Sequence, residues 1–152
     1  MALDRPACRK LSFDLLARRE HSRRELERKL DKRGFAANLI DETLDELEQS
    51  GALSARRFAE SFVSARAAKG QGPVRIRADL AKRGVDSSDF EDLLHDGSID
   101  WPAIARNVRT KRFGRDAPAD FAERARQARF LQYRGFDMDQ IDAALDIGGD
   151  SD

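Results

Sequence analysis

The sequence predicts an all-α protein built from three tandem repeats of three helices each. A short segment recurs three times, reading Leu-Asp-Lys-Arg-Gly-Phe at 30–35, Leu-Ala-Lys-Arg-Gly-Val at 80–85 and Leu-Gln-Tyr-Arg-Gly-Phe at 131–136. Apolar residues keep helical spacing elsewhere, as Trp101 and Val108 do at i and i+7. No segment alternates Val, Ile and Thr as a strand would.

The repeat is set by three glycines, Gly34, Gly84 and Gly135, which are 50 and 51 residues apart. A leucine stands four residues before each glycine and an arginine one before it, with apolar residues one, six and ten after. Periods of this length are typical of stacked helical units. We expect an N-terminal segment, three helical repeats and a flexible tail, at residues 1–10, 11–53, 54–97, 98–147 and 148–152.

The first repeat is expected to hold helices near 9–19, 22–33 and 37–50. Ser22 and Glu25 have the spacing of a capping box, in which each side chain bonds to the other residue's backbone N–H. Gly34 follows the second helix, where a left-handed conformation is least costly for glycine.

The second and third repeats are expected to follow the same plan. Pro73 suits a first helical position, and Asp86 and Asp137 are good N-caps for the third helices. Pro118 opens the matching helix of the third repeat about five residues earlier relative to its glycine, so that helix should be longer. The expected helices are 54–69, 73–83 and 87–95, then 99–113, 118–133 and 138–147.

The net charge of zero hides a strong alternation. Residues 1–34, 54–85 and 101–136 carry +5, +6 and +6, whereas the segments 35–53, 86–100 and 137–152 carry −5, −6 and −6. The first two helices of each repeat are therefore basic and the third is acidic. A basic strip along such an array suits a polyanion, such as the DNA phosphate backbone, or an acidic protein.

The candidate binding residues are the cations of this strip. In the second helix of the first repeat, three of them lie at i, i+4 and i+8 and form one stripe. The alternative is that basic and acidic helices neutralise each other, which stabilises little at a surface. The strip consists of Arg24, Arg28, Lys32, Arg66, Arg75, Arg77, Lys82, Arg109, Lys111, Arg112, Arg126 and Arg129.

No constellation of catalytic residues emerges. Cys8 is the one cysteine, and the two histidines stand far from it in sequence. The glycine-rich segment 69–73 lacks the ending of a phosphate-binding loop, so we interpret it as a helix stop and a new start. Trp101 and Phe58 lie on apolar stripes and are expected in the core. We expect a cytoplasmic monomer without catalysis, cofactor, metal or membrane span.

The second repeat carries the most specific motifs: Arg57-Phe-Ala59, Gly70-x-Gly72-Pro73 and the recurring Arg-Gly. Together they resemble the RecX family of bacterial recombination regulators, from about residue 11 to 145. The resemblance departs at Ser54 and Arg56, where the family often has acidic residues. It implies three tandem three-helix repeats in an elongated, curved array.

The resemblance also implies a function. Such a protein would bind RecA and its filament on single-stranded DNA, and would inhibit ATP hydrolysis, strand exchange and coprotease activity. Weak direct contact with DNA is compatible with this role. The alternative is a helix-turn-helix-like protein that acts on DNA directly, and an enzyme is a weaker third hypothesis.

Overall fold

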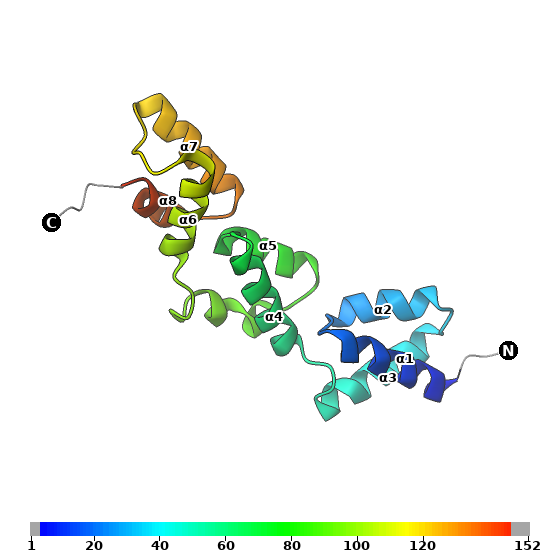
Figure 1. The fold of residues 1–152 in the computed structure, drawn as a ribbon. Helices are drawn as coiled ribbons and strands as arrows, with labels where there is room; N and C mark the ends of the chain where they lie inside the picture. The colour runs from blue at the N-terminus through cyan, green and yellow to red at the C-terminus, as the bar shows by residue number, and fades with distance from the viewer. Residues whose placement is uncertain (1–3, 147–152) are drawn as a thin grey trace. The chain divides into compact units, whose positions relative to one another are not determined.

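A computed structural model of the chain describes residues 4–146 (Figure 1). The predicted tail, 148–152, lies outside these residues, as do residues 1–3 and 147. Every regular element in the described part is helical, so the predicted all-α class is confirmed. The chain forms two compact units: residues 4–61 with 80–90, and 62–79 with 91–146.

The first repeat consists of α1 (Arg5–Arg18), α2 (Arg23–Lys32) and α3 (Ala37–Ser50), which pack against one another (Figure 1). Helix α1 begins four residues earlier than expected, because the Asp4 side chain accepts a hydrogen bond from the Ala7 N–H at 3.0 Å and so caps the helix. The repeat's buried core consists of Cys8, Leu26, Leu30, Phe35, Ile40, Leu44, Leu47 and Leu53.

The second repeat consists of α4 (Ala55–Ala68) and α5 (Pro73–Lys82), followed by two 3₁₀ turns, η1 (Ser87–Asp89) and η2 (Glu91–Leu94). The single helix expected over 87–95 is therefore wrong. Asp86 makes no side-chain capping bond, and Phe90 has φ −144° between the two turns, which interrupts the helical backbone. Phe90 and Leu94 are nevertheless buried, as the repeat pattern requires.

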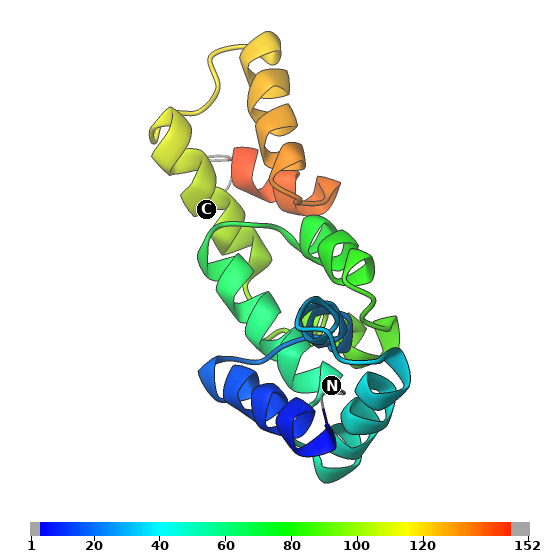
Figure 2. The same ribbon diagram turned by 90° about the vertical axis from the view of Figure 1, so that its right-hand side faces the viewer.

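The third repeat consists of α6 (Trp101–Phe113), α7 (Phe121–Tyr133) and α8 (Met138–Leu145), and the three pack together (Figure 2). Helix α7 starts three residues later than expected, because Asp120 caps it through the Glu123 N–H at 2.8 Å, and Pro118 stays in the preceding loop. The helix still has 13 residues against 10 in α2 and α5, so its predicted extra length is confirmed. Asp137 forms a capping box with Gln140.

The three glycine turns have one conformation. Gly34, Gly84 and Gly135 have φ of 93°, 79° and 99°, so the predicted left-handed turn is confirmed. In the first turn the Gly34 N–H donates to the Asp31 carbonyl at 3.0 Å, and the Phe35 N–H to the Leu30 carbonyl at 3.3 Å. This pair of bonds satisfies the last carbonyls of a helix, and the same pair recurs in the other two turns.

Candidate partner and nucleic-acid interface

The stripe predicted on α2 is exposed. Arg28 and Lys32 are solvent-exposed, and within residues 4–146 neither side chain has an ionic or hydrogen-bonding partner. Arg24 differs, because its Nη1 donates to the Lys82 carbonyl at 2.8 Å, near the end of α5. This bond places the backbone of Lys82, which is itself exposed, beside Arg24, so cations of two repeats lie on the first compact unit.

Two predicted cations of the second repeat are already neutralised. The Arg66 guanidinium pairs with Asp79 at 3.3 Å and covers the Phe62 ring at 4.4 Å from its centroid. Arg77 Nε pairs with Glu91 at 2.7 Å. Arg75 has no carboxylate partner among the described residues, and its guanidinium lies 5.6 Å from the centroid of the Tyr133 ring.

Arg109 is not a surface residue, contrary to its place in the predicted strip. It is completely buried, and its Nε donates to Gln127 Oε1 at 2.8 Å. The other nitrogens donate to the carbonyls of Gly114, at 3.2 Å, and Asp116. Burial lowers the pKa of Arg109, and the charge of Asp116 opposes that effect. The residue anchors the loop between α6 and α7 to the core.

The remaining predicted cations of the third repeat are exposed. Lys111 and Arg129 have no carboxylate partner in the described part of the chain. Arg112 lies over the Phe130 ring, whereas Arg126 pairs with Glu123 at 3.0 Å. The structure therefore leaves exposed and unpaired cations in each repeat, but fewer than the sequence alone indicates.

Ion pairs between the basic and acidic helices are made by arginines that the sequence did not single out. Arg23 Nη1 reaches Glu48 at 2.6 Å on α3, and Arg124 Nη2 reaches Asp146 at 3.1 Å, just past α8. Each arginine stands 11 residues before its repeat glycine, so alignment of the repeats could have identified the pair. These exposed pairs contribute little stability, but they occupy part of the acidic surface.

A buried histidine links α1 to α2. His21 is 1% exposed, and its Nδ1 lies 3.0 Å from the Arg19 carbonyl. Since a carbonyl only accepts, Nδ1 carries the proton and Nε2 accepts from the Lys29 ammonium at 2.9 Å. Burial lowers the pKa of His21, with the Arg19 and Lys29 charges acting in the same direction.

The segment 69–75 and the turn 134–135 form what we call the inter-repeat joint. The N–H groups of Gly72 and Val74 donate to the carbonyls of Arg134 and Gly135, at 2.8 and 2.9 Å. In return the Arg134 guanidinium donates to the carbonyls of Lys69, at 3.0 Å, and Gly70, at 3.3 Å. The free N–H groups at the start of α5 are thus satisfied by the free carbonyls at the end of α7.

Glycine is required for this approach. A Cβ on Gly72 would lie 2.3 Å from the Gly135 oxygen, and a Cβ on Gly135 would lie 2.3 Å from the Arg75 Cβ. Atoms cannot approach so closely, so either side chain would force the two segments apart. The segment 69–73 does stop one helix and start another, as predicted, and it also forms this contact.

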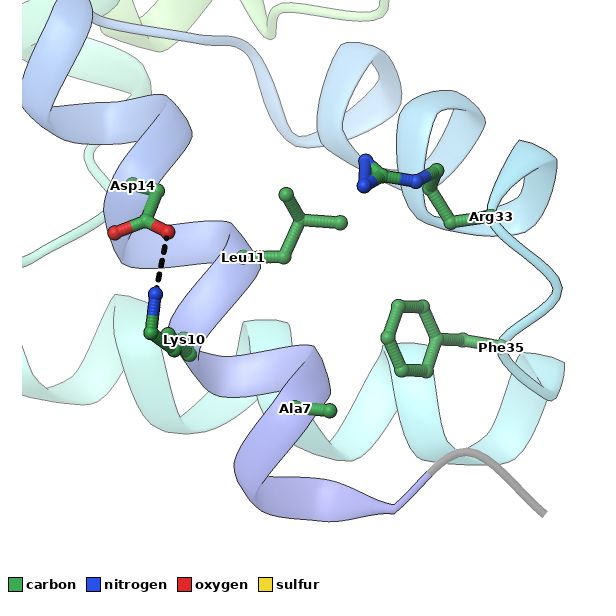
Figure 3. A pocket seen from close by; sticks show the side chains of 6 residues that line it. All are labelled: Ala7, Lys10, Leu11, Asp14, Arg33 and Phe35. Atoms are coloured by element: carbon green, nitrogen blue, oxygen red, sulfur yellow. Dashed lines mark hydrogen bonds and ion pairs between the residues drawn. The ribbon is translucent and has the colours of Figure 1, made fainter. Parts of the chain in front are cut away.

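An open hollow of about 320 Å³ lies between α1 and the turn after α2 (Figure 3). Arg33 and Phe35 point toward Leu11 across it, and Lys10 and Asp14 form an ion pair at 3.1 Å on its rim. Both side chains of that pair are exposed, as in an ordinary surface ion pair. Within residues 4–146 no cluster of three metal-binding side chains occurs. No helix described there has the length and hydropathy needed to span a membrane.

Comparisons with known proteins agree with the tandem architecture. Three family models, described as the first, second and third three-helix domains of RecX, match residues 8–47, 56–94 and 100–145. A protein named regulatory protein RecX from Pseudomonas savastanoi pv. phaseolicola is 48% identical over 100% of this chain and 99% of its own length. A namesake from Halorhodospira halophila is 47% identical over 96% of this chain and 91% of its own.

The fold also matches a solved structure. The crystal structure of RecX from Lactobacillus salivarius superimposes with a TM-score of 0.77, covering 93% of this chain and 94% of that one at 21% sequence identity. At this identity the likeness supports the fold, whereas the relatives above carry the family assignment.

Proposed function

Because the chain belongs to the RecX family of regulatory proteins, we propose that it binds RecA and the RecA filament on single-stranded DNA. It would lower the filament's ATPase, strand-exchange and coprotease activities in the cytoplasm, as a monomer without cofactor or catalytic step of its own. The observation that carries the proposal is the family membership of three consecutive domains. Unpaired cations recurring in each repeat support it, namely Arg28, Lys32, Arg75, Lys82, Lys111 and Arg129.

A tandem array suits a filament because both are periodic. Each repeat presents only a few cations, and an isolated exposed ion pair contributes about 0–1 kcal/mol. Several such contacts made by one chain raise the overall affinity through effective concentration. Inhibition then follows from occupancy of the filament surface, without any reaction carried out by this chain.

The test is the RecA ATPase measured with single-stranded DNA and ATP. Arg28→Glu with Lys32→Glu is sharper than a triple change that includes Arg24, whose side chain also holds Lys82. We expect the double variant to need at least about tenfold more protein for half-maximal inhibition, which corresponds to about 1.4 kcal/mol. The wild-type helical circular dichroism should be retained, because both residues are exposed.

The matched control is Arg18→Glu with Arg106→Glu, which makes the same charge change at two exposed cations outside the strip. It should inhibit like the wild type. If saturating wild-type protein leaves both ATPase and strand exchange unchanged, the proposed function fails. If the wild type inhibits and the Arg28→Glu, Lys32→Glu variant inhibits equally well, the assignment of the binding site fails while the proposed function stands.

A second candidate is direct DNA binding without RecA, which the unpaired cations on α2 and α5 favour. It predicts a steep fall of affinity with salt, since each neutralised phosphate releases counterions. Titration of labelled DNA at several salt concentrations tests this, and weak, salt-independent binding would exclude it.

A further inference from the structure

The exposed aromatic ring at the inter-repeat joint is not explained by the fold. Tyr133, the last residue of α7, is 76% exposed, and Arg75 from α5 lies over its ring. Arg129 is one helical turn before Tyr133, so the two side chains share a face of α7. Neither arginine has a carboxylate partner among the described residues. The patch therefore combines an open ring with two uncompensated positive charges.

The joint fixes the parts of this patch relative to each other. Arg75 and Tyr133 come from different repeats, 58 positions apart in sequence. The Val74 N–H donates to the Gly135 carbonyl, and the Arg75 Cβ sits where a side chain of Gly135 would be. The backbone contact thus holds Arg75 beside Tyr133 before any ligand arrives, which lowers the ordering cost of binding.

We propose that Tyr133, Arg75 and Arg129 form a contact site for single-stranded nucleic acid. One base stacks on the open surface of the Tyr133 ring, and the two guanidinium groups bind the flanking phosphates. Stacking on an aromatic ring is independent of base identity and contributes about 1–3 kcal/mol per base. Guanidinium groups bind phosphate through paired N–H donors. The proposal deepens the direct DNA contact considered above and does not require RecA.

Charge favours nucleic acid over a protein ligand here. The comparable pair of Arg9 and Phe13 on α1 is neutralised, because Arg9 is bound to Glu46 at 3.1 Å. Within residues 4–146 no carboxylate pairs with Arg75 or Arg129 beside the Tyr133 ring, so the site keeps its attraction for phosphate. Trp101, the other polar aromatic residue, is buried and donates to the Leu94 carbonyl at 3.0 Å, so it cannot stack on a base.

The experiment measures binding of fluorescein-labelled oligo(dT) to the full chain without RecA. Tyr133→Ala is expected to weaken binding by about 5- to 150-fold, the equivalent of one lost stack, and Tyr133→Phe to bind like the wild type. Arg75→Met should weaken binding and flatten its salt dependence. Phe121→Ala is the matched control, because Phe121 is an aromatic residue 84% exposed at the other end of α7.

The outcomes separate this site from the proposed function. The proposal is overturned if Tyr133→Ala binds the oligonucleotide as tightly as the wild type does. It is also overturned if Phe121→Ala loses as much oligonucleotide affinity as Tyr133→Ala. If Tyr133→Ala binds the oligonucleotide normally but loses binding to RecA without DNA, the patch is a protein contact and the proposal is wrong. Because the oligonucleotide assay contains no RecA, its result stands whether or not the chain inhibits the filament.

Discussion

At the scale of single residues, burial decides which charges are free to bind. Arg109 and Arg106 stand on one helix, yet Arg109 is fully buried and Arg106 is exposed. The Arg109 guanidinium satisfies Gln127 and two loop carbonyls. Removing it would leave those groups without their partner inside the protein, which costs more than a lost surface contact.

We therefore predict that Arg109→Met lowers the free energy of unfolding by about 1–3 kcal/mol, the cost of leaving buried acceptors without a donor. Arg109→Lys should restore little of it, because an ammonium cannot reproduce the planar set of donors. Urea unfolding followed by circular dichroism measures both. Arg106→Met is the control and should change stability by less than about 0.5 kcal/mol; similar losses for the two methionine variants would contradict the structural role of Arg109.

His21 gives a pH dependence with a definite sign. Its pKa is lowered in the folded protein by burial, so the unfolded chain binds a proton more readily. Stability should therefore be complete above the unfolded pKa of about 6.5 and should fall as pH drops toward the folded pKa. The slope cannot exceed about 1.4 kcal/mol per pH unit for one group.

Unfolding free energies measured from pH 7.5 to 5.5 test this, with His21→Asn as the reference. The wild type should lose more stability than the variant across that range, and parallel curves would show that His21 is not linked to folding. Glu25 titrates in a lower pH range: burial raises its pKa, but the hydrogen bond from Arg19 and the nearby positive charges together outweigh burial and keep the pKa below the usual value. Its contribution is lost only as the pH falls further.

At the scale of elements, the sequence predicted a feature correctly where neighbouring residues alone determine it. The three glycine turns could be predicted because a left-handed residue after a helix depends on its immediate neighbours. The two 3₁₀ turns in the 87–95 segment could not be predicted, because the buried residues Phe90 and Leu94 are compatible with either a helix or 3₁₀ turns. The joint was also missed: its hydrogen bonds link residues 62 and 61 positions apart, and no local pattern encodes that pairing.

The joint predicts an asymmetry between glycine substitutions. Gly72→Ala should break the joint through its clash with Gly135, with a loss of about 1–3 kcal/mol. It should also speed hydrogen exchange of the Val74 amide, which donates across the joint. Gly51→Ala is the control: Gly51 has φ +83° and nothing within 4 Å, so this variant suffers local backbone strain only.

Nuclear magnetic resonance measures the hydrogen-exchange rate of the Val74 amide in both variants. Fast exchange in Gly72→Ala together with wild-type exchange in Gly51→Ala is the expected result. Unchanged protection in Gly72→Ala would mean that the joint does not hold the repeats together.

At the scale of the whole molecule, the sequence predicted the class, the repeat and the alternation of charge. It did not reveal which cations remain available, since Arg66 and Arg77 are paired and Arg109 is buried only because of tertiary contacts. The overall zero charge and the exposed unpaired cations are compatible, because one arginine can contact several carboxylates: among the described residues Arg23 contacts four and Arg124 two.

The longer α7 has a consequence for how such a chain could grow. The joint uses N–H groups 12 and 10 residues before Gly84, at the open start of α5. The equivalent residues before Gly135 are Glu123 and Ala125, which lie inside α7, and the Glu123 N–H is already bound to Asp120. A fourth unit added by gene duplication would find no donors there to dock on. The third repeat therefore lacks, at these two positions of α7, the free backbone donors with which the second repeat forms the joint.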